Sequence, residues 1–356
     1  MPPAPGWRSR RDHEVYLRAL WEAAFGRAPI GLDDDFFDLG GNSLLAARML
    51  AEIQRATNQE LSLATLLQAP TIRQLAGVID AAAWDSPVPL VQLRPGTGRP
   101  FFVMHSLAGN FLELWAVLRA LQTPRPVLGL QARGLGEGQE PHLRVADMAR
   151  EYILQMRRVQ PVGPYSLGGF SFGGLIAYEV AQQLRCMGEQ VDLLCLIDTH
   201  VHGRYLPLRQ WLHHRIGRTL RTVQTLQSLP PGSRWPYVRM KAYVLLDRAR
   251  ACVGQMPQRP ELVGDVVREA NFPPALRRVR GAMLLALRNY RPQPYDGKIV
   301  FVRSAVLRDG DPLPFWQRVV RGGLELSITP GNHDEMIVGA NAKVLAQVLA
   351  SHLQGA

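Results

Sequence analysis

The chain has 356 residues, of which 47% are apolar and 20% are charged, and its formal net charge is +11. This composition can fill a large core, so it excludes a disordered or collagen-like chain, and the length leaves room for two or three domains. No apolar run approaches the roughly 18 residues that a membrane-spanning helix needs, and the N-terminus lacks the apolar stretch of a signal peptide, so we expect a cytoplasmic protein without membrane contact.

The basic charge is concentrated in one segment. Residues 199–260 contain 11 basic side chains and one acidic side chain, whereas residues 10–80 contain seven basic and ten acidic side chains. The basic segment lacks a zinc-ligand pattern, an aromatic RNA-binding motif and a glycine-rich loop, so the sequence argues against a nucleic-acid partner. The cysteines at 186, 195 and 252 fit neither a disulfide framework nor a metal site, so we expect buried thiols and no metal.

Residues 14–83 alternate helical patterns with short polar breaks and contain no strand-like stretch, which predicts a small all-α bundle. Within it, the segment Asp34–Ser43 leads directly into an amphipathic helix, so Ser43 is placed at a helix N-terminus. Either Asn42 or Ser43 can serve there simply as the N-cap. A helix N-terminus preceded by two glycines is also where a bulky phosphodiester is favoured.

The segment Asp35–Leu44, with the sequence DFFDLGGNSL, resembles the signature of peptidyl carrier proteins from nonribosomal peptide synthetases. Ala69–Ala76 is similar to the start of the last helix in that family. The resemblance implies that Ser43 carries 4′-phosphopantetheine, attached by a phosphopantetheinyl transferase, and that its thiol holds an acyl or peptidyl group as a thioester. The acidic balance of residues 10–80 suits docking onto enzymes with basic faces.

A strand-like stretch begins at residue 90, and from Pro100 onward apolar runs alternate with longer helical patterns, which predicts an α/β domain with mostly parallel strands. The expected strands include Leu90–Leu93, Phe101–Met104, Leu193–Ile197, Ile299–Val302 and Leu324–Ile328. Between about residues 199 and 274 this alternation is interrupted by the basic, helix-patterned segment. The insertion is long enough to cover an active site as a lid.

Gly169–Gly173 has the pattern Gly-x-Ser-x-Gly, follows a strand-like run and precedes a helical pattern. This context is typical of a nucleophile elbow, in which glycines relieve crowding so that the hydroxyl of Ser171 projects above the sheet. A serine hydroxyl also needs a base, and an acid that orients the base. His333 follows a strand-like run and a Pro-Gly turn, and is the candidate base. Six other histidines are expected at the surface or in the lid: His105, His200, His202, His213, His214 and His352.

Asp198 directly follows the expected strand Leu193–Ile197, one strand beyond the elbow, and is the candidate acid. The order Ser, Asp, His is that of α/β hydrolases. Asp309 or Asp311, one strand later, is the alternative acid. When a serine attacks a carbonyl carbon, the carbonyl oxygen becomes negatively charged, and two backbone amides are needed to stabilise this oxyanion. We expect these from Phe172, directly after the serine, and from Leu107 in the loop after an early strand, with Ala108 as the next choice.

From about residue 88 to the end, the chain resembles the type I thioesterase domains that close nonribosomal peptide and polyketide assembly lines. The likeness includes the Gly-Phe-Ser-Phe-Gly elbow, Asn289–Lys298 and the segment Pro330–Asp334. It implies an α/β-hydrolase fold with a helical lid, and it supports Asp198 as the acid. It also implies transfer of the chain from Ser43 to Ser171, followed by hydrolysis or macrocyclisation.

Together the two resemblances suggest the C-terminal carrier–thioesterase didomain of a longer nonribosomal peptide synthetase. The predicted division is a peptidyl carrier domain at 1–84, a linker at 85–89 and a thioesterase domain at 90–356. The expected partners are upstream condensation and adenylation modules and the acyl or peptidyl thioester. The alternatives are a general carboxylesterase or lipase, a non-catalytic carrier and docking module, and a hydrolase that repairs misloaded carriers.

Overall fold

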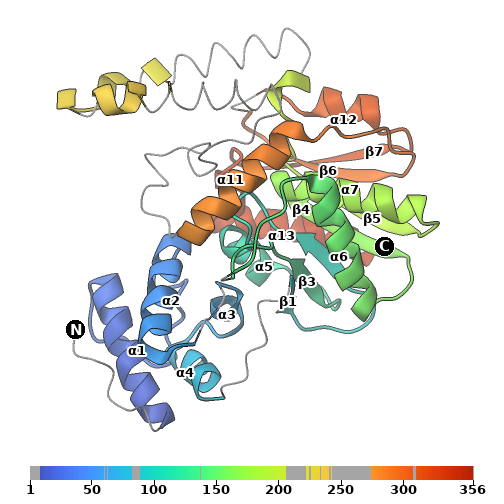
Figure 1. The fold of residues 1–356 in the computed structure, drawn as a ribbon. Helices are drawn as coiled ribbons and strands as arrows, with labels where there is room; N and C mark the ends of the chain where they lie inside the picture. Colours follow the sequence, from blue (N-terminus) through green and yellow to red (C-terminus); the bar gives the residue numbers. More distant parts are fainter. Residues whose placement is uncertain are drawn as a thin grey trace.

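The computed structural model describes residues 9–59, 61, 63–81, 89–136, 138–205, 222–223, 226–232, 234–239, 242, 274–307 and 310–355. A helical N-terminal part precedes an α/β part built on a seven-stranded sheet (Figure 1). The predicted linker lies outside the described residues except for Pro89, and so does most of the predicted lid. Among the described helices, none is both long enough and apolar enough to cross a membrane.

The described helices of the N-terminal part are α1 (Arg10–Phe25), α2 (Ser43–Thr57), α3 (Leu63–Gln68) and α4 (Ile72–Asp80). The hydroxyl of Ser9 caps the start of α1, and Gly26 ends it with a φ of 63° that favours glycine. The centre of the bundle is aromatic, because the buried ring of Phe36 lies edge-on to the rings of Trp21 and Phe25, with centroids 5.4 Å apart in both pairs. The predicted small all-α bundle is confirmed.

The sheet has the strand order β1-β3-β2-β4-β5-β6-β7. Its strands are β1 (Leu90–Arg94), β2 (Phe101–Met104), β3 (Val127–Leu130), β4 (Tyr165–Phe170), β5 (Val191–Ile197), β6 (Ile299–Ser304) and β7 (Leu324–Thr329). β1 runs antiparallel to β3, and every other neighbouring pair is parallel. Parallel strands end at the same edge of a sheet, so the loops after β2, β4, β5 and β7 gather there.

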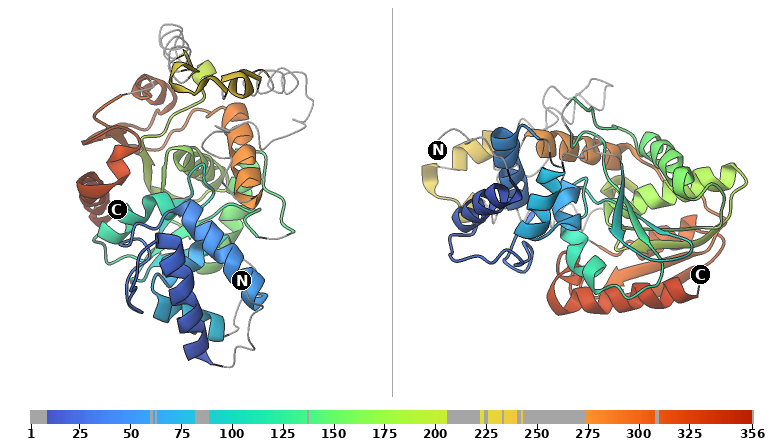
Figure 2. Two further views of the ribbon diagram at one scale, coloured as in Figure 1. Left: turned by 90° about the vertical axis from the view of Figure 1, so that its left-hand side faces the viewer. Right: turned by 90° about the horizontal axis from the view of Figure 1, so that it is seen from below.

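Helices cover both faces of the sheet (Figure 2). They are α5 (Trp115–Ala120), α6 (Val145–Val159), α7 (Phe172–Cys186), α11 (Pro274–Asn289), α12 (Leu313–Val319) and α13 (Gly339–Gln354). Because side chains alternate along a strand, Phe101 and Val103 pack with α5 and α13, whereas Phe102 and Met104 pack with α6 and α7. The apolar cluster that contains residues of α5 and α13 continues into the helical bundle, so the N-terminal part packs against the α/β part.

The structure corrects two expectations about burial. Cys195 in β5 is buried as expected, but Cys186, the last residue of α7, is exposed, and Cys252 lies outside the described residues. His105, expected at the surface or in the lid, is fully buried. Its ring lies 2.8 Å from the hydroxyl of Tyr152, so a polar partner compensates for the burial.

Candidate active site

Ser171 is the first residue after β4 and immediately precedes α7. Its φ of 55° and ψ of −118° lie in a region that costs a non-glycine residue about 1–3 kcal/mol, and its amide donates to the carbonyl of Ile197 over 2.8 Å. A Cβ at Gly169 would overlap the backbone of Gly173, and a Cβ at Gly173 would lie 2.5 Å from the carbonyl oxygen of Met104. The two glycines are therefore required for this sharp turn.

Asp198 occupies the equivalent position after β5. Its φ is 42°, its side chain is fully buried, and its amide donates to the carbonyl of Val302 over 2.7 Å. The backbone amide of Ser304 donates to Oδ1 over 2.9 Å, and the Ser304 hydroxyl donates to Oδ2 over 3.1 Å. These bonds fix the orientation of the carboxylate.

His333 lies in the loop between β7 and the short 3₁₀ helix Glu335–Ile337. Its Nδ1 is 2.7 Å from Asp198 Oδ2, and its Nε2 is 3.0 Å from Ser171 Oγ. The imidazole also stacks on the ring of Phe170, with centroids 4.6 Å apart and planes inclined by 22°. The structure therefore brings the predicted serine, histidine and aspartate into one line of contacts.

The charge of Asp198 is maintained despite its burial. Burial disfavours the ionised carboxylate, but contacts from His200 and His333 favour it, and so does the hydrogen bond from the Ser304 amide. Together they hold the pKa of Asp198 well below its usual value. An ionised carboxylate beside Nδ1 keeps the proton on that nitrogen, which leaves Nε2 as the acceptor that faces Ser171.

Of the two alternative acids, Asp311 does not join this line of contacts. Asp311 pairs with Arg303 over 2.8 Å and accepts a hydrogen bond from the backbone amide of Leu313. Asp309 lies outside the described residues. The contact between Asp198 and His333 therefore favours Asp198 as the acid.

The two amides proposed for the oxyanion lie at the same edge of the sheet. Met104, the last residue of β2, pairs with Gly169 of β4, so the loop after β2 runs beside the elbow. Neither the amide of Leu107 nor that of Phe172 donates a hydrogen bond to another residue that the structure describes. The amide of Ala108 donates to the Ser106 hydroxyl over 3.4 Å, which favours Leu107 over Ala108.

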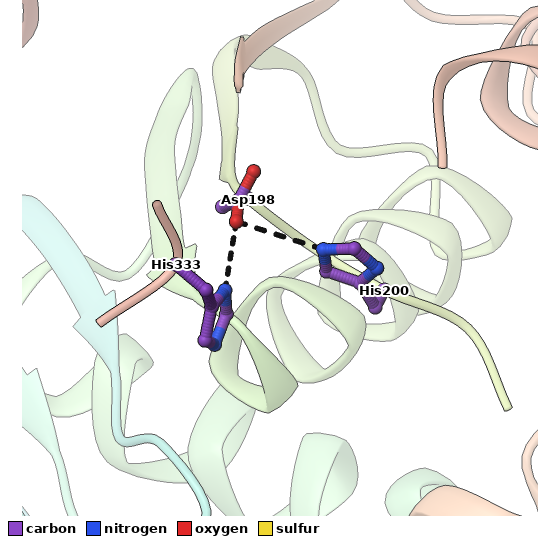
Figure 3. Close-up of side chains that lie close together, drawn as sticks. All are labelled: Asp198, His200 and His333. Carbon is purple, nitrogen blue, oxygen red and sulfur yellow. Dashed lines mark hydrogen bonds and ion pairs between the residues drawn. The ribbon is translucent and has the colours of Figure 1, made fainter. Parts of the chain in front are cut away.

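His200 is a site residue that the sequence interpretation missed, because it was assigned to the surface or the lid. Its Nε2 lies 3.6 Å from Asp198 Oδ2, and its ring is edge-on to that of His333 with centroids 5.5 Å apart (Figure 3). The available signal was its position two residues after Asp198, on the loop that leaves β5.

The loop before Ser43 contains two glycines and leads directly into α2. Ser43 begins α2, and the side chain of Asn42 caps this helix by accepting from the amide of Leu45 over 3.0 Å. Gly40 has a φ of 97°, and a Cβ at Gly41 would overlap the ring of Phe36. With Asn42 as the cap and exposed neighbours on this loop, the N-terminus of α2 is a position at which a phosphodiester is favoured.

The same loop contacts the α/β part. Asp38 Oδ1 lies 2.7 Å from Arg119 Nη1 in α5, and Asp35 Oδ2 lies 3.7 Å from the same nitrogen. The ring of Phe37 packs on that of Trp115, with centroids 4.9 Å apart. The hydrogen bond with Asp38 raises the pKa of Arg119, which is already charged at any physiological pH. Among the described residues, these ion pairs and this aromatic contact add to the apolar cluster that joins the bundle to α5.

Comparison with known proteins identifies both parts. The family profile described as a thioesterase domain matches residues 99–352, which is well over half of the chain. The chain belongs to the thioesterase domain family. A second profile, described as a phosphopantetheine attachment site, matches residues 15–79. The predicted order of a carrier domain followed by a thioesterase domain is therefore confirmed, and the enzyme is a hydrolase that acts on thioesters.

Full-length relatives are much longer than this chain. A dimodular nonribosomal peptide synthase of Bacillus subtilis (strain 168) is 30% identical over 361 residues, which cover 97% of this chain and 14% of that protein. An indigoidine synthase of Dickeya dadantii is 38% identical over 191 residues, which cover 53% of this chain and 13% of that protein. The thioesterase family member described here therefore spans a small part of either relative.

Two solved structures are similar in fold to all or part of this chain. A holo four-domain nonribosomal peptide synthetase, bound to AMP and glycine, matches with a TM-score of 0.57 and 28% identity, covering 99% of this chain and 27% of that one. The Vlm2 thioesterase domain with a bound dodecadepsipeptide matches with a TM-score of 0.51 and 21% identity, covering 74% of this chain and 97% of that one. The second match confirms the α/β-hydrolase fold of the thioesterase domain.

Proposed function

We propose that this chain transfers an acyl or peptidyl group from a carrier thioester to Ser171 and then releases it, by hydrolysis or macrocyclisation, in nonribosomal peptide biosynthesis. The observation that carries the proposal is the line of contacts from Asp198 Oδ2 to His333 and from His333 Nε2 to Ser171 Oγ, at 2.7 and 3.0 Å. The carrier domain in the same chain, and the synthetase relatives, support a thioester as the substrate.

Ser43 is the proposed attachment residue for 4′-phosphopantetheine, loaded by a phosphopantetheinyl transferase. When bound there, the group supplies a terminal thiol that holds the acyl chain as a thioester. Upstream synthetase modules are the proposed source of that chain. On this chain, Asn42 and the two preceding glycines shape the loop that leads to Ser43.

In the acylation step, Ser171 Oγ attacks the thioester carbonyl carbon while His333 Nε2 accepts the hydroxyl proton. The negative charge that develops on the carbonyl oxygen is stabilised by the amides of Leu107 and Phe172. Asp198 keeps the second ring proton on Nδ1 and stabilises the imidazolium. Collapse of the tetrahedral intermediate breaks the carbon–sulfur bond, His333 returns its proton to the departing sulfur, and an ester on Ser171 remains.

The second step reverses the proton transfers. His333 accepts a proton from water, or from an amine or hydroxyl within the acyl chain, as that group attacks the ester carbonyl. Ser171 then leaves and regains its proton from His333. Water gives a linear acid and an internal nucleophile gives a ring, so the same base supports both outcomes.

Intact-mass measurement tests the proposal. The chain is incubated with a phosphopantetheinyl transferase and a short acyl-coenzyme A, as wild type, Ser43→Ala, Ser171→Ala and the exposed-site control Ser351→Ala. We expect the acyl-pantetheine mass to be absent in Ser43→Ala, to persist in Ser171→Ala, and to decay to the pantetheine mass in the wild type and Ser351→Ala. No mass gain on wild type overturns the attachment at Ser43, and equal decay in Ser171→Ala overturns the nucleophile.

A further inference from the structure

The loop that leaves β5 brings a second histidine to the catalytic carboxylate. Both His200 Nε2 and His333 Nδ1 approach Asp198 Oδ2, at 3.6 and 2.7 Å, and Figure 3 shows the two rings converging on this oxygen. The acyl-transfer steps use Asp198 and His333 but give His200 no role. We propose that Asp198, His200 and His333 form a binding site for a zinc-like divalent cation that inhibits the thioesterase.

The donor atoms suit such an ion. Two imidazole nitrogens and one carboxylate oxygen are ligands that Zn²⁺ binds readily, commonly with water in the fourth position. The three ligand atoms all lie within 4.8 Å of one another. Bonds of about 2.1 Å in a tetrahedral site place ligand atoms about 3.4 Å apart. Two ligand atoms at the 4.8 Å limit would therefore have to approach each other by about 1.5 Å at most.

The surroundings favour binding at this position. The Asp198 carboxylate is already oriented by the amide and hydroxyl of Ser304, and such outer hydrogen bonds fix ligating groups in known metal sites. Asp198 is fully buried, whereas the side chains of His200 and His333 are 31% and 33% exposed. An ion can therefore reach the site from the side of the two histidines.

Binding of the ion changes which nitrogen of His333 carries the proton. In the metal-free protein, Nδ1–H faces Asp198 and the lone pair of Nε2 faces Ser171 Oγ at 3.0 Å. When Nδ1 donates its lone pair to the cation, the neutral ring carries its single proton on Nε2. Nε2 then donates to Ser171 instead of accepting its proton, so the serine is not activated, although no proton is gained or lost by the ring.

The loss of activity rests on the proposed roles of Ser171 and His333, whereas binding of the ion does not. The two are therefore measured separately on the full chain after treatment with a chelator. Co²⁺ titration followed by visible absorption reports binding at a tetrahedral site, and turnover of an acyl-pantetheine thioester with added Zn²⁺ reports inhibition. If the metal-free enzyme does not turn over the thioester, the proposed function fails, and the Co²⁺ spectrum still reports on the site.

The variant His200→Gln removes one ligand, and each variant is compared with its own metal-free rate. We expect this change to raise the inhibitory Zn²⁺ concentration by about tenfold or more and to remove the Co²⁺ absorption. The control His142→Gln, at a histidine paired with Glu151 over 2.8 Å, keeps the wild-type response. A second control, Cys186→Ser, removes an exposed thiol that could also bind Zn²⁺. This variant should keep the wild-type response as well.

Three results of the turnover assay overturn the proposal: no inhibition of the wild type by Zn²⁺, equal inhibition of His200→Gln, or relief of inhibition by Cys186→Ser. A measurement on the unmutated chain guards against misfolding of a variant. Zn²⁺ should slow the labelling of Ser171 by a fluorophosphonate, and a chelator should restore the labelling rate. Labelling that is unchanged by Zn²⁺ also contradicts the site.

Discussion

Nη1 of Arg119 in α5 lies 2.7 Å from Oδ1 of Asp38, in the carrier loop that leads to Ser43. The carrier and the thioesterase are therefore in contact through the loop that presents the proposed attachment residue. We predict that reversing one charge, in Arg119→Asp or Asp38→Arg, slows acyl transfer within the chain by about two- to fivefold, because an exposed pair contributes up to about 1 kcal/mol. The double reversal should recover part of the rate.

Single-turnover quench experiments on the acylated chain measure this effect. Turnover of a free acyl-pantetheine thioester is the control reaction and should stay at the wild-type rate in each variant, since it does not require docking. Arg144→Asp, which alters an arginine paired with Asp147 in α6, is the matched control for a change in charge. Equal slowing of the free substrate, or no recovery in the double reversal, contradicts a docking role.

The contact between Phe37 and Trp115 predicts a different salt response. Replacing Phe37 with alanine removes apolar contact area, which salt does not screen, so transfer should slow at both low and high ionic strength. The Arg119→Asp defect should shrink at high ionic strength, because charges on exposed side chains are screened over about 10 Å at 0.1 M salt. The same quench experiment in 0.05 M and 0.5 M NaCl separates the two contacts.

Asp198→Asn should lower the deacylation and acylation rates by roughly three to four orders of magnitude, because an amide does not hold the Nδ1–H tautomer of His333. Asp311→Asn is the matched change at the alternative acid and removes only the pair with Arg303. Its activity should remain close to that of the wild type. A larger loss in Asp311→Asn than in Asp198→Asn, measured as kcat on an acyl-pantetheine thioester, would reverse the assignment of the acid.

Gly174→Ala should destabilise the thioesterase domain by several kcal/mol, since the added Cβ would overlap the side chain of Thr199 at the base of the site. Gly77→Ala, inside α4, is the contrasting change. Its Cβ would meet Arg10 at 3.4 Å, an ordinary contact, so alanine should stabilise the helix by about 0.5–1 kcal/mol. Urea unfolding of both variants measures whether the free energy of unfolding falls, as expected for Gly174→Ala, or rises, as expected for Gly77→Ala.

His105 predicts a pH dependence of stability. Burial lowers its pKa to about 4 in the folded protein, below the usual value of 6.5. The unfolded chain therefore binds the extra proton first, and stability contributed by the neutral ring is lost as the pH falls from about 6.5 towards 4. The shift corresponds to about 3 kcal/mol. Urea unfolding of wild type and His105→Gln at pH 7, 5.5 and 4 should show a shallower pH dependence in the variant.

The sequence carries the local parts of this site. Glycines around Ser171 are needed where the chain turns sharply, and Asp198 and His333 each follow an apolar run that forms a strand, so their positions were predictable from the pattern alone. His200 was harder to predict, because its position two residues after Asp198 is the only sequence signal and its contact with that carboxylate depends on the path of the loop after β5. Burial of His105 likewise depends on Tyr152, which is 47 residues away in α6.

Elements with weak local signals were also harder to predict. The strand β3, Val127–Leu130, is short and is not singled out by the sequence pattern, although it pairs with both β1 and β2. Exposure of Cys186 follows from its place at the end of α7, where the packed face of the helix gives way to the surface. The contact of Arg119 with Asp38 joins two domains, so no periodicity within either domain reveals it.

Ser171 and Asp198 each stand one residue beyond neighbouring strands, and each amide still donates to the next strand before the chain turns away. The spacing between the two side chains is thus set by how β4, β5 and β6 align. A residue inserted near the carboxyl end of β4 or β5 would move one of them by about 3.3 Å relative to the other. Added length at the amino ends of these strands leaves the alignment unchanged. We therefore expect changes in length to be tolerated at the amino edge of the sheet and not at the carboxyl edge, where Ser171 and Asp198 lie.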